Sequence, residues 1–356
     1  MSGSPVPFSQ LNGWEADDHL AAFSCFRISA RALVENVHES RPGTPPSTAL
    51  IEIAKKALAA GNGIKTAIAA RNFFETHFEP VKPQQASGFV TAYFEPEVEA
   101  SRTRSEAFSY PLYKRPADLV KLDNSNRTAN LSAEIEYARR DGDKLVEYYD
   151  RKQIDDGALR DQGLELVWLK SAIEGFYIHI QGSARMIFSD GSSMRVSYAG
   201  KTGHPYTSIG KLLVDRGIMT VEQANMKNMR AWLGADLPRA MEVLHNNRSF
   251  IFFTNIENQS PDLGPLAAAG VQLTPGRSLA VDRTVHAYGT PVWIATAKPL
   301  PSQNVPFQRL MIAQDTGSAI IGPSRGDLFI GSGNEAGLIA GSVRHETDFI
   351  TLQPRA

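Results

Sequence analysis

Three aspartates in the last third of the chain lie where apolar, strand-like runs meet glycine-rich turns. Asp315 follows the apolar run 310–313, Asp327 precedes a second apolar run at 328–330, and Asp282 holds a similar place upstream. Strand ends can hold a carboxylate at the edge of a cleft, and nearby glycines allow tight turns and close approach to a ligand. Such carboxylates could carry acid–base chemistry, although aspartates at strand ends more often accept hydrogen bonds from turn amides.

The motifs around these aspartates resemble those of a known family. The chain resembles the 3D domain, named for three aspartates, in AVDRTVHAYGTPVWI, AQDTGSAIIG and GDLFIGSGNEAG. It also resembles the membrane-bound lytic murein transglycosylase A (MltA) family in four upstream segments, GFVTAYFEPEVEAS, YPLYKRP, IHIQGSARMIFSDGSSMRVSYAGKTGHPYTSIGKLLVDRG and NRSFIFFT. The resemblance runs in the expected order from LNGWEADDHLAAF to the end of the chain.

The resemblance implies a peptidoglycan lytic exotransglycosylase, which cleaves the β-1,4 bond between N-acetylmuramic acid (MurNAc) and N-acetylglucosamine (GlcNAc) without water. Asp327 aligns with the family's catalytic aspartate. It would protonate the leaving oxygen and then activate the C6 hydroxyl of MurNAc, which closes a 1,6-anhydro ring. An aspartate stays protonated near neutral pH only through burial or a nearby negative charge, so Asp315 is expected to tune Asp327 or to orient sugar hydroxyls. The mechanism needs no cofactor or metal, and the eight scattered histidines form no metal-binding motif.

Further positions are candidates for substrate binding. They are Thr91, Tyr93 and Glu95 on a strand expected at 88–96; Gln181, Gly182 and Ser183 in IHIQGSARM; Lys201, His204 and Tyr206 in KTGHPY; and Asp282, Gly317 and Glu335 around the aspartates. Amides, hydroxyls and a tyrosine face suit N-acetyl sugars, which offer hydrogen-bonding groups and apolar ring faces. Any of these residues could instead hydrogen-bond at a strand end, which is the simpler interpretation for Gln181. Asp282 could equally stabilise a turn beside Arg283.

Composition narrows the class of partner. The 37 Lys and Arg residues nearly balance the 38 Asp and Glu residues, so no net field favours nucleic acid, and a neutral polymer such as a peptidoglycan glycan strand is an easier partner.

A single cysteine, Cys25, excludes an internal disulfide, and its helical, apolar setting predicts a buried packing residue. We expect a monomer.

The sequence contains no apolar run long enough to span a membrane and no signal peptide. A murein enzyme must reach its substrate, so the resemblance implies a location in the periplasm or cell envelope. We expect that a segment directing the protein there, or associating it with the outer membrane, lies outside this sequence.

Apolar spacing predicts the scaffold elements. Helices are expected at about 16–37, from Ser47 or Thr48 to about residue 61, and at 64–78. Strand-like runs between 164 and 196, FYIHI among them, predict a β-rich insert in which His179 faces solvent or the groove. Later helices are expected at 208–215, from a capping box at 220–223 to residue 233, and at 238–245.

These elements predict a mainly β protein of the α+β class. Residues 1–97 and 201–356 would form a barrel domain with a helical layer, with the 3D region at about 265–345, and residues 98–200 an inserted, smaller all-β domain. Short, punctuated strands suit a small barrel, and the resemblance implies a double-psi β-barrel. The glycan strand would lie in a groove between barrel and insert.

Two other functions remain open at this point. A peptidoglycan hydrolase of the muramidase type would use Asp315 or Glu335 to activate water, and its products would carry one more water than anhydro products. A non-catalytic glycan-binding module would keep the cleft but release no muropeptides.

Overall fold

The computed structural model describes residues 3–83, 88–129, 131–257, 259–260, 262–301, 303–317 and 319–355. It divides into two compact units, of which the first comprises Met1–Glu95 and Gln259–Ala356 and the second Pro96–Asn258. The sequence predicts an insert that ends near residue 200. In the structure the insert continues to Asn258, because β12 (Ile251–Asn255) pairs with β11 (Ser193–Lys201) of the same unit. The protein has a mixed α+β, strand-rich fold.

Six strands of the first unit pair in a closed ring. Their order is β17-β14-β15-β13-β16-β3, and β3 pairs back with β17, while β2 and β1 extend the sheet beyond β17. The strands are β1 (Gly3–Pro5), β2 (Phe78–Pro83), β3 (Gly88–Glu95), β13 (Ser278–Val281), β14 (Pro291–Pro299), β15 (Pro306–Asp315), β16 (Arg325–Ser332) and β17 (Arg344–Pro354). Each ring strand is therefore hydrogen-bonded on both sides, which makes the ring a firm support for side chains on its surface.

Along the ring strands, successive side chains alternate between the core of the ring and the opposite face, which carries Asp327. Leu279 of β13 pairs with Leu328 of β16, and both side chains are fully buried in the core of the ring. The adjacent pair, Ala280 and Asp327, points to the opposite face, because successive side chains on a strand alternate.

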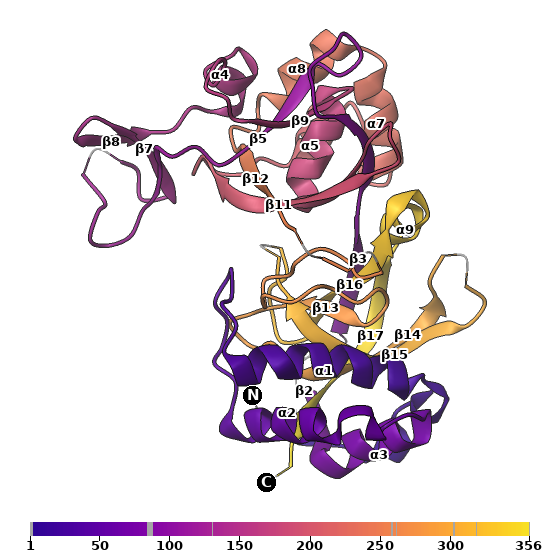
Figure 1. Cartoon of the computed structure of the whole chain (residues 1–356). Helices are drawn as coiled ribbons and strands as arrows, with labels where there is room; N and C mark the ends of the chain where they lie inside the picture. Colours follow the sequence, from indigo (N-terminus) through magenta and orange to yellow (C-terminus); the bar gives the residue numbers. More distant parts are fainter. Residues whose placement is uncertain are drawn as a thin grey trace. The chain divides into compact units, whose positions relative to one another are not determined.

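A layer of three helices packs on the first unit's sheet (Figure 1). These are α1 (His19–Glu35), α2 (Thr48–Ala60) and α3 (Ala67–His77), and they confirm the three predicted helices. Asp18, Ser47 and Thr66 cap them, each accepting a hydrogen bond from a backbone N–H of the first turn. The buried faces of α1 and α3 are rich in phenylalanine, and the core that the helices form includes strand residues such as Trp293 and Leu310. Shorter helices complete this unit: η1 (Phe8–Gln10), η2 (Trp14–Ala16), η3 (Gly61–Gly63) and α9 (Gly333–Ala340).

The second unit holds two sheets and five helices among its described residues, so the prediction of an all-β insert is wrong. One sheet has the order β12-β11-β10-β4-β9-β5 and the other the order β6-β7-β8. Its remaining strands are β4 (Glu97–Ser101), β5 (Tyr110–Tyr113), β6 (Leu119–Lys121), β7 (Tyr137–Asp141), β8 (Lys144–Glu147), β9 (Glu165–Leu169) and β10 (Ser183–Ile187). Its helices are α4 (Arg151–Asp155), α5 (Ala172–Gln181), α6 (Ile209–Asp215), α7 (Met226–Gly234) and α8 (Leu237–Leu244).

Helix α5 occupies the run FYIHI, which alternation had favoured as a strand. Ser171 caps the helix by accepting from the Glu174 N–H, and Gly182 ends it with a left-handed φ of 76°. His179 is buried in this helix, where its Nδ1 lies 3.1 Å from an Arg151 guanidinium nitrogen, so the expected exposure of His179 is also wrong. A five-residue apolar run cannot distinguish a buried helix from a strand by period alone.

The later helices lie close to their predicted ranges but belong to the second unit. Ser208 caps α6 and Asp236 caps α8. Thr220 and Gln223 make the reciprocal bonds of a capping box, but α7 begins later, with Asn225 as its cap. Apolar residues of α6, α7 and α8 share a core with Phe176 and Tyr177 of α5, which explains why this segment stays with the insert.

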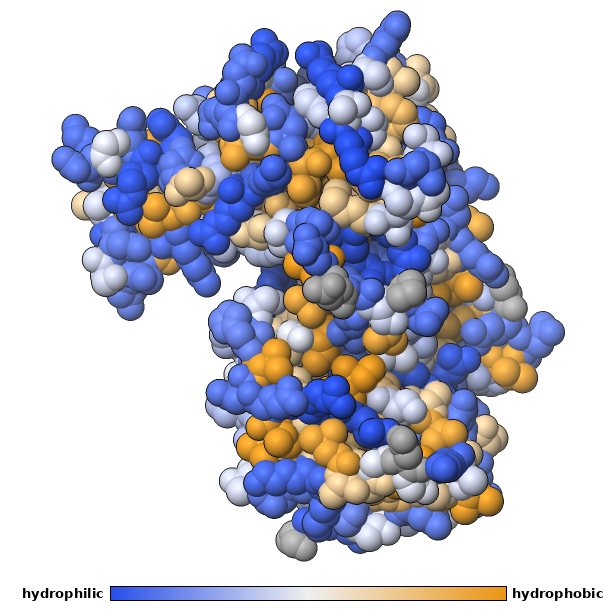
Figure 2. All heavy atoms as spheres, in the orientation of Figure 1, coloured by the Kyte–Doolittle hydropathy of each residue, from blue (hydrophilic) through white to orange (hydrophobic). Residues whose placement is uncertain are grey.

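Surface composition is mixed. Figure 2 shows hydrophobic residues interspersed with hydrophilic ones over the helical layer of the first unit. None of the helices within the described residues combines the length and apolar character needed to cross a membrane.

Candidate active site

Four residues of four adjacent strands form one row on the first unit. Ala280 of β13 pairs with Asp315 of β15 on one side and with Asp327 of β16 on the other. Asp327 in turn pairs with Thr91 of β3. Residues in register project from the same face of a sheet, so the row brings Asp315, Asp327 and Thr91 to one surface. We call these four residues the carboxylate row.

A register shift in β15 places Asp315 in the carboxylate row. Leu279 pairs with Ala313, but the next residue, Ala280, pairs with Asp315, so Gln314 is the extra residue. Gln314 is fully buried and contacts α1, where its amide nitrogen donates to Ser29 Oγ at 2.8 Å. The helical layer thus secures the irregularity that turns the Asp315 carboxylate to the same face as Asp327.

The sequence predicts that Asp327 directly precedes a strand. In the structure Asp327 lies inside that strand. It is the third residue of β16, and its side chain is half-buried. The Thr91 hydroxyl donates to Asp327 Oδ1, and the cation of Arg325 is nearby. Burial raises the pKa of Asp327 to about 6, against the lowering effects of Thr91 and Arg325 and with a small contribution from the charge of Asp315. A carboxyl group with this pKa is protonated in a substantial fraction of molecules at slightly acidic pH.

Asp315 has hydrogen-bond donors on both carboxylate oxygens. The Tyr93 hydroxyl donates to Oδ2 at 2.9 Å, and the Ala268 N–H donates to Oδ1 at 3.1 Å. Burial raises the pKa of Asp315, although these donors act in the opposite direction. The Tyr93 ring packs beside Phe329 of β16, with centroids 5.3 Å apart, so Tyr93 connects Asp315 to the small apolar cluster around Phe329.

Asp282 holds a loop together. It follows β13 directly and accepts at Oδ1 from the Thr284 N–H at 2.9 Å and hydroxyl at 2.7 Å, and at Oδ2 from the Gly322 N–H at 2.7 Å. Burial acts to raise the pKa of Asp282, but these hydrogen bonds outweigh it and hold the pKa below its usual value. Gly322 has a left-handed φ of 110°, a conformation that glycine adopts without strain.

Three other candidates on the first unit take different positions. Glu95, at the end of β3, is fully buried and accepts from the Ser332 hydroxyl at 2.7 Å. Gly317 lies in the turn after β15, where its carbonyl accepts from the Ile320 N–H. Glu335 is exposed in the first turn of α9 and is not part of the carboxylate row.

The remaining six candidates lie on the second unit. Gln181 ends α5, Gly182 is its left-handed C-cap, and Ser183 begins β10. Lys201 forms an ion pair with Glu136 at 2.8 Å, and His204 is buried with Nε2 2.8 Å from the Tyr148 carbonyl. Tyr206 is 58% exposed, so its ring face is accessible on that unit.

Arg325 is a neighbour of the carboxylate row, although the sequence motifs did not single it out. Its Nη2 donates to Thr91 Oγ1 at 2.7 Å, and its Nη1 donates to the Gly326 carbonyl. It stands two residues before Asp327 on β16, and side chains two apart on a strand share a face. This two-residue spacing is visible in the sequence and could have identified Arg325 as a neighbour of Asp327.

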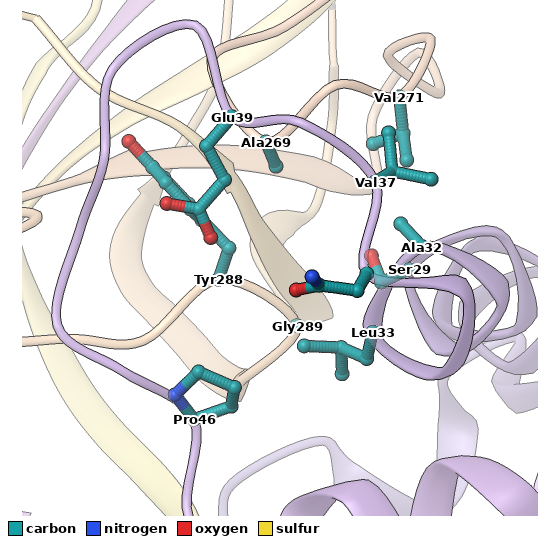
Figure 3. Close-up of a pocket in the computed structure, with 11 residues that line it drawn as sticks. Ser29, Ala32, Leu33, Val37, Glu39, Pro46, Ala269, Val271, Tyr288 and Gly289 are labelled. Atoms are coloured by element: carbon teal, nitrogen blue, oxygen red, sulfur yellow. The ribbon is translucent and has the colours of Figure 1, made fainter.

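Two hollows on the first unit lie elsewhere. One, of about 60 Å³, is lined by residues such as Ser29, Leu33 and Tyr288 at the end of α1 (Figure 3). The other, of about 410 Å³, is lined by Arg27, Arg31 and Gly270 among others. Neither contains Asp315 or Asp327. The carboxylate row is therefore identified by its chemistry and not by an enclosed cavity.

Comparison with known proteins gives consistent matches. Residues 89–254 match the MltA specific insert domain family and residues 277–353 the 3D domain family. Curated relatives include the membrane-bound lytic murein transglycosylases A of Vibrio cholerae, 32% identical over 269 residues (74% of this chain, 64% of the relative), and of Escherichia coli K12, 34% identical over 263 residues (72% and 62%). The matched region thus spans less than two thirds of these relatives.

Solved structures match over nearly the whole chain. A membrane-bound lytic murein transglycosylase from Agrobacterium tumefaciens is 40% identical with a TM-score of 0.90, over 100% of this chain and 98% of that one. The structure of E. coli MltA with bound chitohexaose is 26% identical with a TM-score of 0.68, over 100% and 92%.

Proposed function

The chain belongs to the membrane-bound lytic murein transglycosylase A family, and we propose that it cleaves the β-1,4 bond between MurNAc and GlcNAc of peptidoglycan without hydrolysis. The observation that carries this proposal is the half-buried Asp327, with its pKa raised to about 6, in a row with a second carboxylate. On this proposal the ring of strands is a double-psi β-barrel and the protein acts in the cell envelope.

Asp327 serves as both acid and base in this reaction. In the first step its proton passes to the glycosidic oxygen as the bond to C1 of MurNAc breaks, and GlcNAc leaves with a free hydroxyl. In the second step the Asp327 carboxylate takes the proton of the MurNAc C6 hydroxyl, whose oxygen bonds to C1 and closes the 1,6-anhydro ring. The nucleophile belongs to the substrate, and intramolecular attack gains from proximity, so no water has to be held in place.

The environment of Asp315 supports ring closure over hydrolysis. Backbones two strands apart are separated by roughly 9–10 Å, a spacing that would also suit a carboxylate pair flanking a water. Both Asp315 oxygens accept hydrogen bonds from the protein, from Tyr93 and Ala268, and on this proposal these bonds fix the carboxyl group in a supporting position and not as a base toward water. When Asp315 is ionised, its charge near Asp327 favours the protonated form of Asp327.

Five of the other candidates are proposed to bind the glycan strand. Thr91 and Tyr93 would act beside the carboxylate row, and Gln181, Lys201 and Tyr206 on the second unit. Chitohexaose, a β-1,4-linked GlcNAc oligomer, bound in a similar structure supports a glycan of this linkage as the ligand. Asp282 and Glu95, which are engaged in internal hydrogen bonds, would support the site without touching sugar.

Mass analysis of the products tests the proposal. The purified protein is incubated with peptidoglycan sacculi at slightly acidic and neutral pH, and the released muropeptides are weighed. Anhydro products, one water lighter than hydrolytic products, are expected. Products carrying the additional water would establish a muramidase instead, and binding to sacculi without release would establish a glycan-binding module.

A further inference from the structure

Arg325 is held tightly beside the carboxylate row. One guanidinium nitrogen donates to Thr91 Oγ1 at 2.7 Å and another to the Gly326 carbonyl. The guanidinium carbon lies 5.5 Å from the centre of the Phe89 ring on β3. Three contacts on two strands therefore fix a cation one hydrogen bond away from the residue that contacts Asp327.

The chemistry of these groups gives the hydrogen bonds a direction. A guanidinium has donors only, so Thr91 Oγ1 must accept from Arg325. The single proton of the Thr91 hydroxyl is then directed to its other partner, Asp327 Oδ1. In a protonated carboxyl group the carbonyl oxygen is the better acceptor, so Oδ1 is the carbonyl oxygen and the acid proton resides on Oδ2.

We propose that Arg325 is a positioning residue that acts through Thr91, orienting the threonine hydroxyl toward Asp327 Oδ1 and thereby reserving Oδ2 for the proton that is transferred. This inference rests on the proposed function and adds to it which oxygen acts and which side chain selects it. Without Arg325 the Thr91 hydroxyl can rotate and accept from the protonated carboxyl, which places the proton on Oδ1, away from the sugar.

The charge of Arg325 also affects the second half of the reaction. The titratable groups around Asp327 are Arg325 on its own strand, Asp315 on β15 and Tyr93 on β3. Arg325 is the one cation among these described groups, and it acts to lower the pKa of Asp327. It therefore stabilises the carboxylate that must accept the C6 hydroxyl proton, while burial and Asp315 favour the acid form.

The test compares variants that remove the donor, the charge or the hydroxyl. Arg325→Met removes donor and charge, Arg325→Lys keeps the charge, Thr91→Val removes the hydroxyl and Thr91→Ser keeps it. Arg31→Met, an exposed arginine on α1, is the matched control. Turnover on soluble peptidoglycan glycan strands and its pH dependence are measured together with the Tm of each variant.

The expected pattern is specific. Arg325→Met and Thr91→Val each lose about 10- to 100-fold in kcat, since a misplaced catalytic group has costs of this order. In Arg325→Met the alkaline fall in kcat/KM moves to higher pH. Arg325→Lys keeps that fall near its wild-type pH, Thr91→Ser recovers much of the activity lost in Thr91→Val, and Arg31→Met behaves as wild type. The double variant Arg325→Met with Thr91→Val is measured as well. Because Arg325 acts through Thr91, its fold-loss in kcat is smaller than the product of the two single fold-losses.

Other outcomes would overturn the inference. Wild-type kcat and pH dependence in Arg325→Met would show that the arginine has no role in turnover, and fully multiplicative losses would show that it does not act through Thr91. If Arg325→Met fails to fold, the two other variants decide. A wild-type kcat in Thr91→Val, or an alkaline fall in Arg325→Lys displaced from its wild-type pH, would overturn the inference. Absence of anhydro products from the wild type would instead remove the proposed function itself.

Discussion

Asp315 and Asp327 flank the same residue, Ala280, from opposite sides of β13. Their separation is set by backbone hydrogen bonds of one strand and not by flexible loops, so the two carboxyl groups keep a fixed relation in the absence of ligand. The electrostatic influence of one carboxylate on the other is thus a property of the sheet.

The pH dependence of turnover follows from the raised pKa of Asp327. In the free enzyme the acid form is required, so kcat/KM should be highest below about pH 6 and fall about tenfold per pH unit above it. Asp315→Asn removes a charge that favours the acid form, and the fall should then begin at lower pH. Rates on glycan strands from about pH 5 to about pH 8 measure this, and a flat wild-type profile would rule out Asp327 as the titrating acid.

Asp327→Asn should increase stability at neutral pH. The folded-state pKa of Asp327 lies above the unfolded value, so the favourable contribution of the carboxyl group is present below about pH 4 and is lost as pH rises through about 6. We expect the variant to gain about 1–2 kcal/mol of unfolding free energy at pH 7 and little at pH 4. Urea unfolding at both pH values measures it, with the exposed Asp143→Asn as control. A loss of stability at pH 7 would contradict this expectation.

Asp282→Asn should have the opposite effect. The folded-state pKa of Asp282 lies below its unfolded value, so its stabilising contribution is present above the unfolded pKa and is lost as pH falls through the folded pKa. Weakening the bonds from Thr284 and Gly322 should cost about 1–3 kcal/mol at neutral pH, and less in acid. The same unfolding experiments serve, and an unchanged free energy at pH 7 would show that Asp282 does not hold this loop.

Cys25 should be inert in the folded protein. Its side chain is fully buried against Ser278 and Gln314, and burial raises the pKa of the thiol to about 11. We expect no modification by a thiol reagent at pH 8 until denaturant is added, and then one equivalent, since the chain has one cysteine. Rapid labelling of the native protein would contradict the buried position, and Cys25→Ala controls for non-specific reaction.

Local signals in the sequence were sufficient for the first three helices. Asp18, Ser47 and Thr66 each precede an apolar pattern with helical period, and the cap and the pattern agree. Helix α5 was missed because FYIHI fits two periods, although Ser171 and Gly182 at its ends carry the capping signals of a helix. Its position within the insert shows that short apolar runs need their flanking residues to be interpreted.

The carboxylate row depends on pairings that no local pattern reveals. Thr91 and Asp327 are 236 positions apart in the chain, and their contact requires β3 to close the ring beside β16. The irregularity at Gln314, which sets the direction of Asp315, depends on burial against α1. The motifs therefore identified the acids, and the tertiary structure supplies their partners.

The central claim is that Asp327 carries the proton in both steps. Release of anhydromuropeptides from sacculi and binding to sacculi are measured for wild type, Asp327→Asn and Asp315→Asn. The account predicts that Asp327→Asn loses release by about 10²- to 10⁴-fold while binding persists, and that Asp315→Asn loses less. Release at the wild-type rate by a folded Asp327→Asn protein would contradict it.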